Sequence, residues 1–275
     1  MPYTSDSRGY KNLLRGNPDA VRILAEGDSW FAYPRRYLAF GPPSNIVQVL
    51  AERDYYVIYS TASIGDEVAA MMTGEQKFSF TKRLGTNEFD IILFSGGGND
   101  IVGRYDFDLF LKPRSSGPHW QDCIEVERLD NKLDLIESVY IELMERVIHY
   151  SLNPDVRVVS HNYDFCVPSP EGYELFDLFP IGESWLFPFL QEKNFSDGDE
   201  QKAVIRFMLQ RFAERLARVE NRYPGKLFIT NTQNTLASSQ WRNEIHPTPA
   251  GFRKIAALIH GTIQQALGAD KPLDK

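Results

Sequence analysis

The sequence predicts an α/β fold in which a parallel sheet is covered by helices on both faces. Short apolar runs rich in β-branched residues alternate with longer amphipathic runs along the 275 residues. This alternation is typical of β–α units, because strands buried on both faces are almost continuously apolar, whereas crossover helices carry one apolar stripe. Turns containing glycine or small polar residues follow several of the apolar runs, at the points where strands would end.

Five short apolar runs are predicted strands: Val21–Glu26, Tyr55–Ser60, Asp90–Ser95, Val156–His161 and Lys226–Thr230. The predicted helices lie between and after them: Ser44–Arg53, Asp66–Thr73, Asp130–Ser151, Glu200–Arg222 and Pro249–Leu267. We expect the last helix to begin after an N-cap at Thr248 and to end before Gly268. Proline at the first helical position and glycine beyond the last one are typical helix boundaries.

The composition is that of a globular protein, with 43% hydrophobic and 24% charged residues, which excludes disorder of the whole chain. A net charge of -7 gives no long-range attraction to nucleic acid or anionic lipid, although Arg35 and Arg36 form a local basic pair. Residues 1–17 contain no apolar stretch of signal-peptide length, and no run of about 18 uncharged apolar residues occurs. We therefore expect a cytoplasmic protein without membrane insertion and without nucleic acid as a partner.

The cysteines and most of the histidines show no pattern of metal ligands. Cys123 and Cys166 form no CxxC pair, so two reduced thiols are the simplest interpretation. Four histidines lack ligand spacing with one another, and we expect no metal site: His119, His149, His161 and His260.

Two stretches, 103–128 and 164–199, interrupt the alternation and are longer than ordinary connections in a compact domain. The second contains six aromatic residues among prolines and glycines: Tyr173, Phe176, Phe179, Trp185, Phe187 and Phe189. One interpretation is an extra subdomain or an interface between subunits. The other is a lid or an acyl-pocket wall beside an active site.

Three polar or glycine-rich segments each follow a predicted strand. Gly27-Asp28-Ser29-Trp30 follows the first, and places a hydroxyl where open parallel sheets bind ligands, although such a turn is also a common helix cap. Ala62–Asp66 follows the second, with Gly65 allowing close backbone approach and Asp66 able to cap the next helix. Ser95-Gly96-Gly97-Gly98-Asn99-Asp100 follows the third, and its glycines suggest that a substrate or another backbone passes nearby.

A fourth segment, Asn243–Phe252, carries His246 between residues that restrict its backbone, just before the last predicted helix. In a flavodoxin-like strand order 2-1-3-4-5, the loops carrying Ser29, Gly65 and Asn99 become neighbours at one edge of the sheet. Backbone N–H groups of Ser29 and Gly65 and the side-chain amide of Asn99 would then converge on one oxygen, as an oxyanion hole requires.

The four segments, in this order, resemble the sequence blocks of the SGNH hydrolase superfamily, also called GDSL esterases and lipases. The matches are Gly27-Asp28-Ser29, Gly65, Gly97-Gly98-Asn99-Asp100 and His246-Pro247, spanning residues 27 to 252. The resemblance implies a three-layer α/β/α sandwich spanning residues 1–275 as a single domain, with insertions at 103–128 and 164–199. It also implies an esterase in which Ser29 attacks a small-molecule ester and His246 acts as base, without metal or organic cofactor.

The chain departs from that family at the acidic member of the triad, where Asn243 stands three residues before His246. An Asp accepts the Nδ1 proton and stabilises the imidazolium, and in a serine protease its replacement by Asn lowers turnover about 10⁴-fold. The ring could be oriented by the Asn243 carbonyl oxygen, by Glu244 or by a backbone carbonyl; we expect Asn243 or the backbone rather than Glu244.

The sequence leaves two alternatives to a serine esterase. One is a binding protein on the same fold whose chemistry is impaired by Asn243. The other is a cysteine hydrolase using Cys166, which we consider less favoured because no histidine-bearing cysteine motif surrounds it. Acyl chain length, alcohol group and oligomeric state leave no sequence signal.

Overall fold

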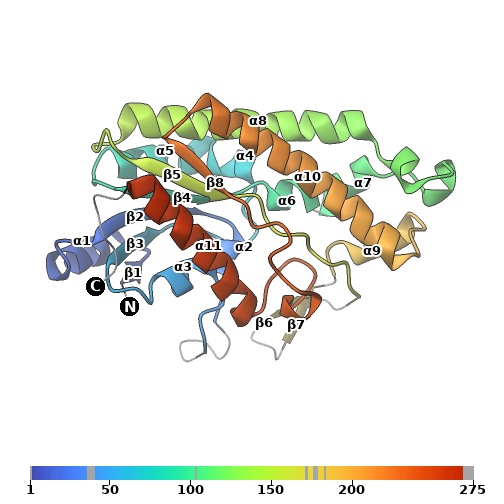
Figure 1. Cartoon of the computed structure of the whole chain (residues 1–275), viewed down its shortest axis with the longest axis horizontal. Helices are drawn as coiled ribbons and strands as arrows, with labels where there is room; N and C mark the ends of the chain where they lie inside the picture. Colours follow the sequence, from blue (N-terminus) through green and yellow to red (C-terminus); the bar gives the residue numbers. More distant parts are fainter. Residues whose placement is uncertain are drawn as a thin grey trace.

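The computed structural model describes residues 2–35, 41–102, 104–170, 173–175, 179–182 and 184–268. Arg36 and Phe176 lie outside these residues, and the side chains of Tyr173 and Phe179 are not described. The predicted α/β class is confirmed, with a parallel sheet between helices (Figure 1).

The main sheet has six parallel strands in the order β1-β3-β2-β4-β5-β8. Their bounds are β1 Tyr3–Thr4, β2 Val21–Gly27, β3 Tyr56–Ser60, β4 Ile91–Ser95, β5 Arg157–His161 and β8 Leu227–Thr230. The prediction of five strands in the order 2-1-3-4-5 is wrong in the number of strands and in the order at one edge. The sheet has a sixth strand, β1, which pairs with the outer side of β3. A strand of two residues is too short to show the alternation that identifies strands in a sequence.

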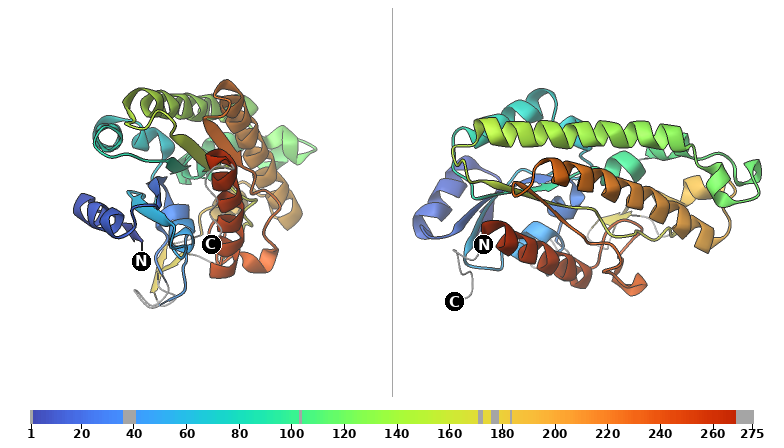
Figure 2. Two further views of the ribbon diagram at one scale, coloured as in Figure 1. Left: turned by 60° about the vertical axis from the view of Figure 1, so that its left-hand side comes forward. Right: turned by 45° about the horizontal axis from the view of Figure 1, so that its top comes forward.

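Eleven α-helices are found in the described chain, and the layers they form are seen in Figures 1 and 2. Their bounds are α1 Ser7–Gly16, α2 Ser29–Ala32, α3 Ile46–Leu50, α4 Val68–Met71, α5 Gly74–Leu84, α6 Gly98–Val102, α7 Arg104–Phe110, α8 Val126–Tyr150, α9 Phe187–Glu192, α10 Gly198–Arg222 and α11 Pro249–Leu267. The α11 boundaries agree with the prediction, and the Thr248 side chain accepts the N–H of Gly251 as an N-cap does.

Alternate side chains of β3 show which helices cover which face of the sheet. Tyr59 packs against Tyr10 of α1 and lies beneath the guanidinium of Arg83 of α5. Tyr56 faces the opposite way. Its hydroxyl oxygen is hydrogen-bonded to the Nδ1 of His260 of α11, at 2.7 Å. Helices α1 and α5 therefore lie on one face and α11 on the other, as expected from the two-residue period of a strand.

The long helices α8 and α10 pack along each other, and Figure 2 shows them on the side of the sheet opposite α11. Tyr140 of α8 meets Phe94 of β4 edge to face and donates its hydroxyl to the carbonyl of Gly96 at 2.9 Å. The buried core is continuous from β2 and β4, the most buried strands, to both helical layers.

The described part of the stretch 103–128, residues 104–128, forms α7, two short 3₁₀ turns at Arg114–Ser116 and Trp120–Cys123, and the start of α8. In the stretch 164–199, the strands β6 Tyr173–Leu175 and β7 Phe179–Gly182 pair as a hairpin, followed by α9 and the start of α10. Leu186, Leu190 and Phe195 from this second stretch are fully buried in the hydrophobic core. The end of this stretch is therefore anchored in the core, and whether the stretch serves as an extra subdomain, an interface, a lid or an acyl-pocket wall stays a question for experiment.

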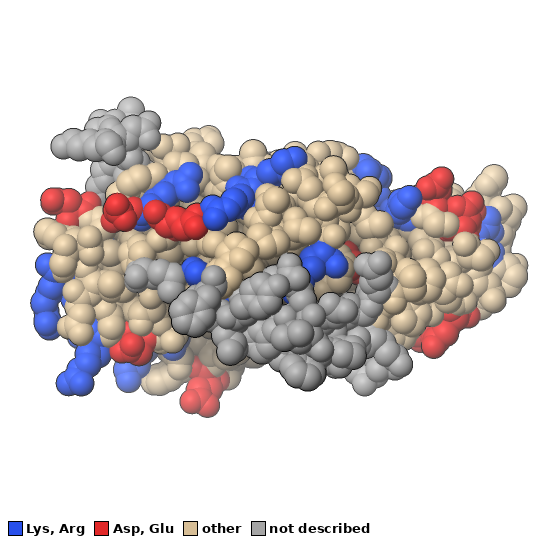
Figure 3. Space-filling model, turned by 90° about the horizontal axis from the view of Figure 1, so that it is seen from below, with Lys and Arg blue, Asp and Glu red and all other residues tan. Residues whose placement is uncertain are grey.

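No helix in the described part of the chain is long and apolar enough to cross a membrane. Figure 3 shows the molecule from below, where Lys and Arg side chains are interspersed with Asp and Glu. The described residues on this face form no extended surface of one sign.

The strand register brings three loops to one edge of the sheet. Gly27 is paired with Ser95, and Ala25 with Ser60, so β2, β3 and β4 end at nearly the same level. Residues that follow these strands are therefore neighbours in space, and this edge carries the segments that the sequence singled out.

Candidate active site

Ser29 begins α2 directly after β2, on a tight strand-to-helix turn. The Asp28 side chain accepts the N–H of Trp30 at 2.9 Å, which caps the short helix. Gly27 is required by close packing, because a Cβ there would lie 2.8 Å from both the Cβ and the carbonyl oxygen of Ser95. The turn thus fixes Ser29 at the carboxyl end of a central strand, where it is 4% exposed.

His246 lies within hydrogen-bonding distance of Ser29, although the two are 217 residues apart. Its Nε2 is 2.8 Å from the Ser29 Oγ, and its Nδ1 is 3.1 Å from the Asn243 side-chain oxygen. That oxygen also accepts the backbone N–H groups of Ile245 at 3.2 Å and of His246 at 2.9 Å.

The contacts of Asn243 determine which ring nitrogen of His246 carries the proton. Two backbone N–H groups donate to the same side-chain atom of Asn243, so this atom must be the amide oxygen and not the amide nitrogen. The Nδ1 facing this oxygen must therefore be protonated, so in the neutral ring Nε2 is the acceptor. Nε2 can accept the Ser29 hydroxyl proton, which is the tautomer required of a general base.

Glu244 does not orient the ring, because its carboxylate points to a different part of the chain. Its two oxygens accept four backbone N–H groups, from Ser169 at 3.1 Å, Leu186 at 2.8 Å, Phe187 at 2.7 Å and from Trp185. Glu244 is 2% exposed and ties the stretch 164–199 to the loop that carries His246. Of the three ways of orienting His246 that the sequence left open, the geometry matches the Asn243 carbonyl oxygen.

The His246 ring is buried, and its surroundings favour the neutral form. Burial, followed by the positive charge of Arg242, lowers the pKa of His246 to about 3. The Tyr33 ring lies 4.3 Å from the imidazole ring, measured between centroids. The Trp30 indole N–H donates to the Ile245 carbonyl at 3.1 Å, which joins the nucleophile turn to the histidine loop.

Gly65 lies on the loop after β3, and Asn99 lies in α6, which follows β4; both flank the turn that carries Ser29. The N–H of Ser63 donates to the carbonyl of Gly27 at 2.8 Å, and the Asn99 amide donates to the carbonyl of Asp66 at 2.9 Å. The loop containing Gly65 is thus bonded to both neighbours. Gly65 has a φ of +83°, and no atom lies within 4 Å of the position of a Cβ. A glycine is required there by conformation, and the space beside it is open.

The glycines after β4 accommodate aromatic side chains, since a Cβ on Gly97 would lie 2.7 Å from the Phe212 ring and one on Gly98 3.0 Å from the Tyr163 ring. One prediction about the acidic residues near these loops is corrected. Asp66 does not cap the next helix. The Asp100 carboxylate takes that place and accepts the N–H of Val68 at 2.8 Å.

A buried polar network beneath Ser29 was not found from the sequence. Asp28 accepts the hydroxyl of Ser95 at 2.8 Å and that of Tyr163, and the His161 Nε2 is 3.0 Å from the Ser95 Oγ. Burial raises the pKa of Asp28 to about 6 and lowers that of His161 to about 3. These residues hold Asp28, and so the turn that carries Ser29, from below.

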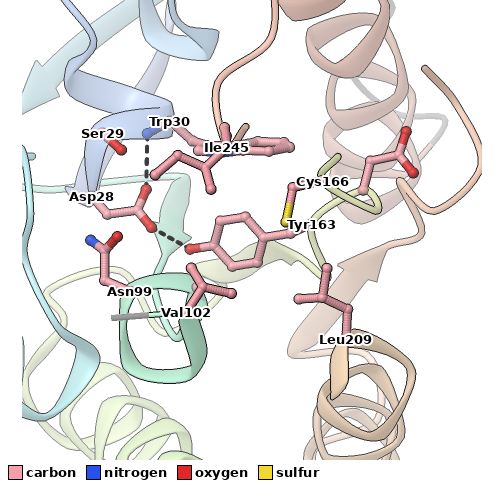
Figure 4. A pocket seen from close by; sticks show the side chains of 11 residues that line it. Asp28, Ser29, Trp30, Asn99, Val102, Tyr163, Cys166, Leu209 and Ile245 are labelled. Carbon is pink, nitrogen blue, oxygen red and sulfur yellow. Dashed lines mark hydrogen bonds between the residues drawn. The ribbon is translucent and has the colours of Figure 1, made fainter. Parts of the chain in front are cut away.

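A small cavity opens beside Ser29 (Figure 4). Ser29, Asp28 and Asn99 line one part of it, and the rest of the wall is mostly apolar: Trp30, Gly98, Val102, Tyr163, Asp164, Cys166, Leu209 and Ile245. The Asp164 oxygens are occupied, since they accept the N–H groups of Phe165, Asn234, Thr235 and Leu236. Gly65 does not contribute to this wall.

The geometry gives no support to a cysteine nucleophile or a metal site. Cys166 is 7% exposed, and burial raises the pKa of its thiol far above the usual range, which disfavours the reactive thiolate. Among the described residues, no three His, Cys, Asp or Glu side chains are grouped as metal ligands.

No family model and no curated protein matches the sequence, but the fold has solved counterparts. The lipase Lip_vut3 from a goat rumen metagenome is 13% identical, with a TM-score of 0.54 over 88% of this chain and 97% of that one. LAE5, an alpha/beta hydrolase enzyme from the metagenome of Lake Arreo, is 14% identical, with a TM-score of 0.50 over 91% and 98% of the two chains. A protein of Slackia heliotrinireducens, provisionally assigned as an SGNH hydrolase, is 13% identical with a TM-score of 0.49 over 89% and 100%.

The first two structures show that the chain shares its α/β fold with hydrolases and lipases. This shared fold agrees with the α/β architecture that the resemblance to the SGNH hydrolases predicts.

Proposed function

We propose that the protein hydrolyses carboxylic esters of small molecules through an acyl-enzyme intermediate, with Ser29 as nucleophile and His246 as general base. The observation that carries the proposal is the distance of 2.8 Å between the Ser29 Oγ and the His246 Nε2, the ring nitrogen that is unprotonated when Nδ1 donates to Asn243. Similarity of the fold to a lipase supports the same reaction class.

In the first step, the Ser29 Oγ attacks the ester carbonyl carbon while its proton moves to the His246 Nε2. The negative charge that develops on the carbonyl oxygen is stabilised by N–H donors at the edge of the sheet. We assign these donors to the backbone N–H groups of Ser29 and Gly65 and to the side chain of Asn99. An amide has two N–H donors, and the Asn99 amide has one left after its bond to Asp66.

Collapse of this intermediate expels the alcohol, which takes the proton from His246 and leaves the acyl group on Ser29. A water molecule then attacks the acyl carbon and gives its proton to the His246 Nε2. The acid departs as the proton returns to the Ser29 Oγ, so each turnover consumes one water and restores both side chains.

Asn243 supports this cycle by orientation rather than by charge. Its oxygen fixes the ring tautomer, whereas an Asp would in addition stabilise the imidazolium that forms in each step. The Asp→Asn change in serine proteases is severe in large part because the ring adopts the wrong tautomer. Since the tautomer here is the productive one, we propose an enzyme that is slow but competent.

The direct test compares hydrolysis of p-nitrophenyl acetate by the wild-type protein and by Ser29→Ala. The proposal predicts turnover by the wild type and only the background rate for the variant. A Tyr33→Phe variant, which keeps the ring beside His246, controls for general effects of substitution near the site. Equal rates for the wild type and Ser29→Ala would overturn the proposal.

The alternative is a binding protein on the same fold. It is favoured by one observation, the neutral Asn243 next to a histidine whose burial already disfavours the imidazolium. This alternative predicts that the wild type and Ser29→Ala bind a small-molecule ester equally and that neither hydrolyses it.

A further inference from the structure

The cavity beside Ser29 is small enough to limit the acyl group of a substrate. Its free volume is about 30 Å³. A water molecule requires at least about 10–15 Å³ of such space, so the cavity has room for roughly two waters or one short alkyl group.

The apolar end of the cavity is formed by side chains from separate parts of the fold. Val102 comes from α6, Leu209 from α10, Cys166 from the segment after β5, and Ile245 from the loop that carries His246. Each of the four is less than 9% exposed, so the wall is packed in the protein interior and not formed by a surface loop.

The polar residues lie at the other end. In Figure 4, Ser29, Asp28 and Asn99 lie on one side of the cavity, and Leu209 lies on the opposite side, with the Tyr163 ring between them. A carbonyl carbon held at the Ser29 Oγ, with its alkyl group in the cavity, would direct that group along the Tyr163 ring and past Val102, with Leu209 as the far wall. The alcohol group would extend away from this closed end.

We propose that the protein is specific for acetyl esters and that Leu209 sets the limit on the length of the acyl chain. This inference rests on the proposed function and identifies its substrate class. Each methylene added beyond the space available in a packed pocket costs about 10- to 200-fold in kcat/KM. The alcohol is not limited by this cavity, so acetylated alcohols of different sizes are accepted.

The test measures kcat/KM for p-nitrophenyl acetate, butyrate, hexanoate and octanoate. The wild type is expected to prefer acetate over butyrate by at least about 10-fold. Leu209→Ala is expected to move the preference to butyrate or hexanoate. Leu216→Ala is the matched control, because Leu216 is also fully buried on α10 but does not line the cavity; this variant should keep the preference for acetate.

Val102→Ala opens the same cavity from α6 and replaces Leu209→Ala if that variant does not fold, as judged by circular dichroism. A wild-type preference for butyrate, hexanoate or octanoate would overturn the inference, as would an unchanged profile in a folded Leu209→Ala or Val102→Ala variant. Hydrolysis of the longer esters that depends on Ser29 would leave the proposed function in place. Absence of Ser29-dependent hydrolysis of all four esters would overturn the proposed function, and the inference with it.

Discussion

Replacement of Asn243 by Asp is expected to accelerate ester hydrolysis. The Asn243 oxygen is 3.1 Å from the His246 Nδ1, so a carboxylate there would lie directly beside the positive charge that forms in the transition state. Hydrogen bonds to charged groups contribute about 1.5–3 kcal/mol. If this stabilisation applies to the transition state alone, kcat rises by about 10- to 150-fold.

The substitution preserves the local geometry. One carboxylate oxygen keeps the bonds from the N–H groups of Ile245 and His246, which the Asn243 oxygen accepts now. Within the described residues, the Asn243 amide nitrogen donates no hydrogen bond, so the second oxygen replaces it without breaking one. The effect on rate can therefore be attributed to charge.

The assay is the pH dependence of kcat/KM for p-nitrophenyl acetate, measured for the wild type, Asn243→Asp and Asn243→Ala. The pKa of His246 is lowered to about 3, so the wild-type rate should stay level well below pH 6 on the acid side. A carboxylate favours the imidazolium and raises this pKa, so the acid limb of Asn243→Asp should move to higher pH. Asn243→Ala removes the acceptor and should be slower than the wild type.

A folded Asn243→Asp variant that is no faster than the wild type would refute the reasoning, because the charge would then have no effect at this position. An acid limb that moves to lower pH would refute the assignment of His246 as the titrating base.

Three further predictions concern single side chains around the site. Asn99→Ala removes one proposed oxyanion donor and should lower kcat about 10²- to 10³-fold with the fold intact, and a reduction below threefold would exclude that role. Glu244→Gln places an amide N–H₂ against backbone donors and should lower the free energy of unfolding in urea by about 1.5–3 kcal/mol; an unchanged midpoint would show that the four hydrogen bonds contribute little. Asp28 has a pKa raised to about 6, so the folded state loses stability as pH rises from the unfolded pKa near 3.8 through 6. Asp28→Asn removes this loss, and its unfolding free energy relative to the wild type should increase by about 2–3 kcal/mol between pH 4 and pH 8; a constant difference would contradict the raised pKa.

Elements with strong apolar patterns were predictable from the sequence, and those with thin apolar faces were not. Strand β4 is buried along its whole length, and its sequence is apolar from Ile91 to Phe94. Helices α1 and α5 were missed because few of their side chains enter the core: Tyr10 alone is buried in α1, and only Phe80 and Leu84 in α5. Both helices are polar on average, so their narrow apolar faces are easily taken for polar connections.

At the site, chain order and strand ends were sufficient to place the loops of Ser29 and Asn99 beside each other. For the group that orients His246, the sequence favoured Asn243 or a backbone carbonyl over Glu244 but did not decide between the first two; the contact with the Asn243 oxygen agrees with this expectation. Glu244 is held away from His246 by backbone N–H groups that are 57 to 75 residues away in the sequence. Backbone donors are common to all side-chain types, so the sequence does not indicate these contacts. Tyr163 was missed because its hydroxyl bonds to Asp28, which is 135 residues away in the sequence.

Covalent labelling of the folded protein by a fluorophosphonate, followed by intact mass and peptide mapping, tests the central assignment most directly. A hydroxyl activated by the adjacent imidazole should form one adduct, located on Ser29, and Ser29→Ala should form none. An adduct on another residue, or equal labelling of the variant, would contradict the assignment of Ser29 as the nucleophile.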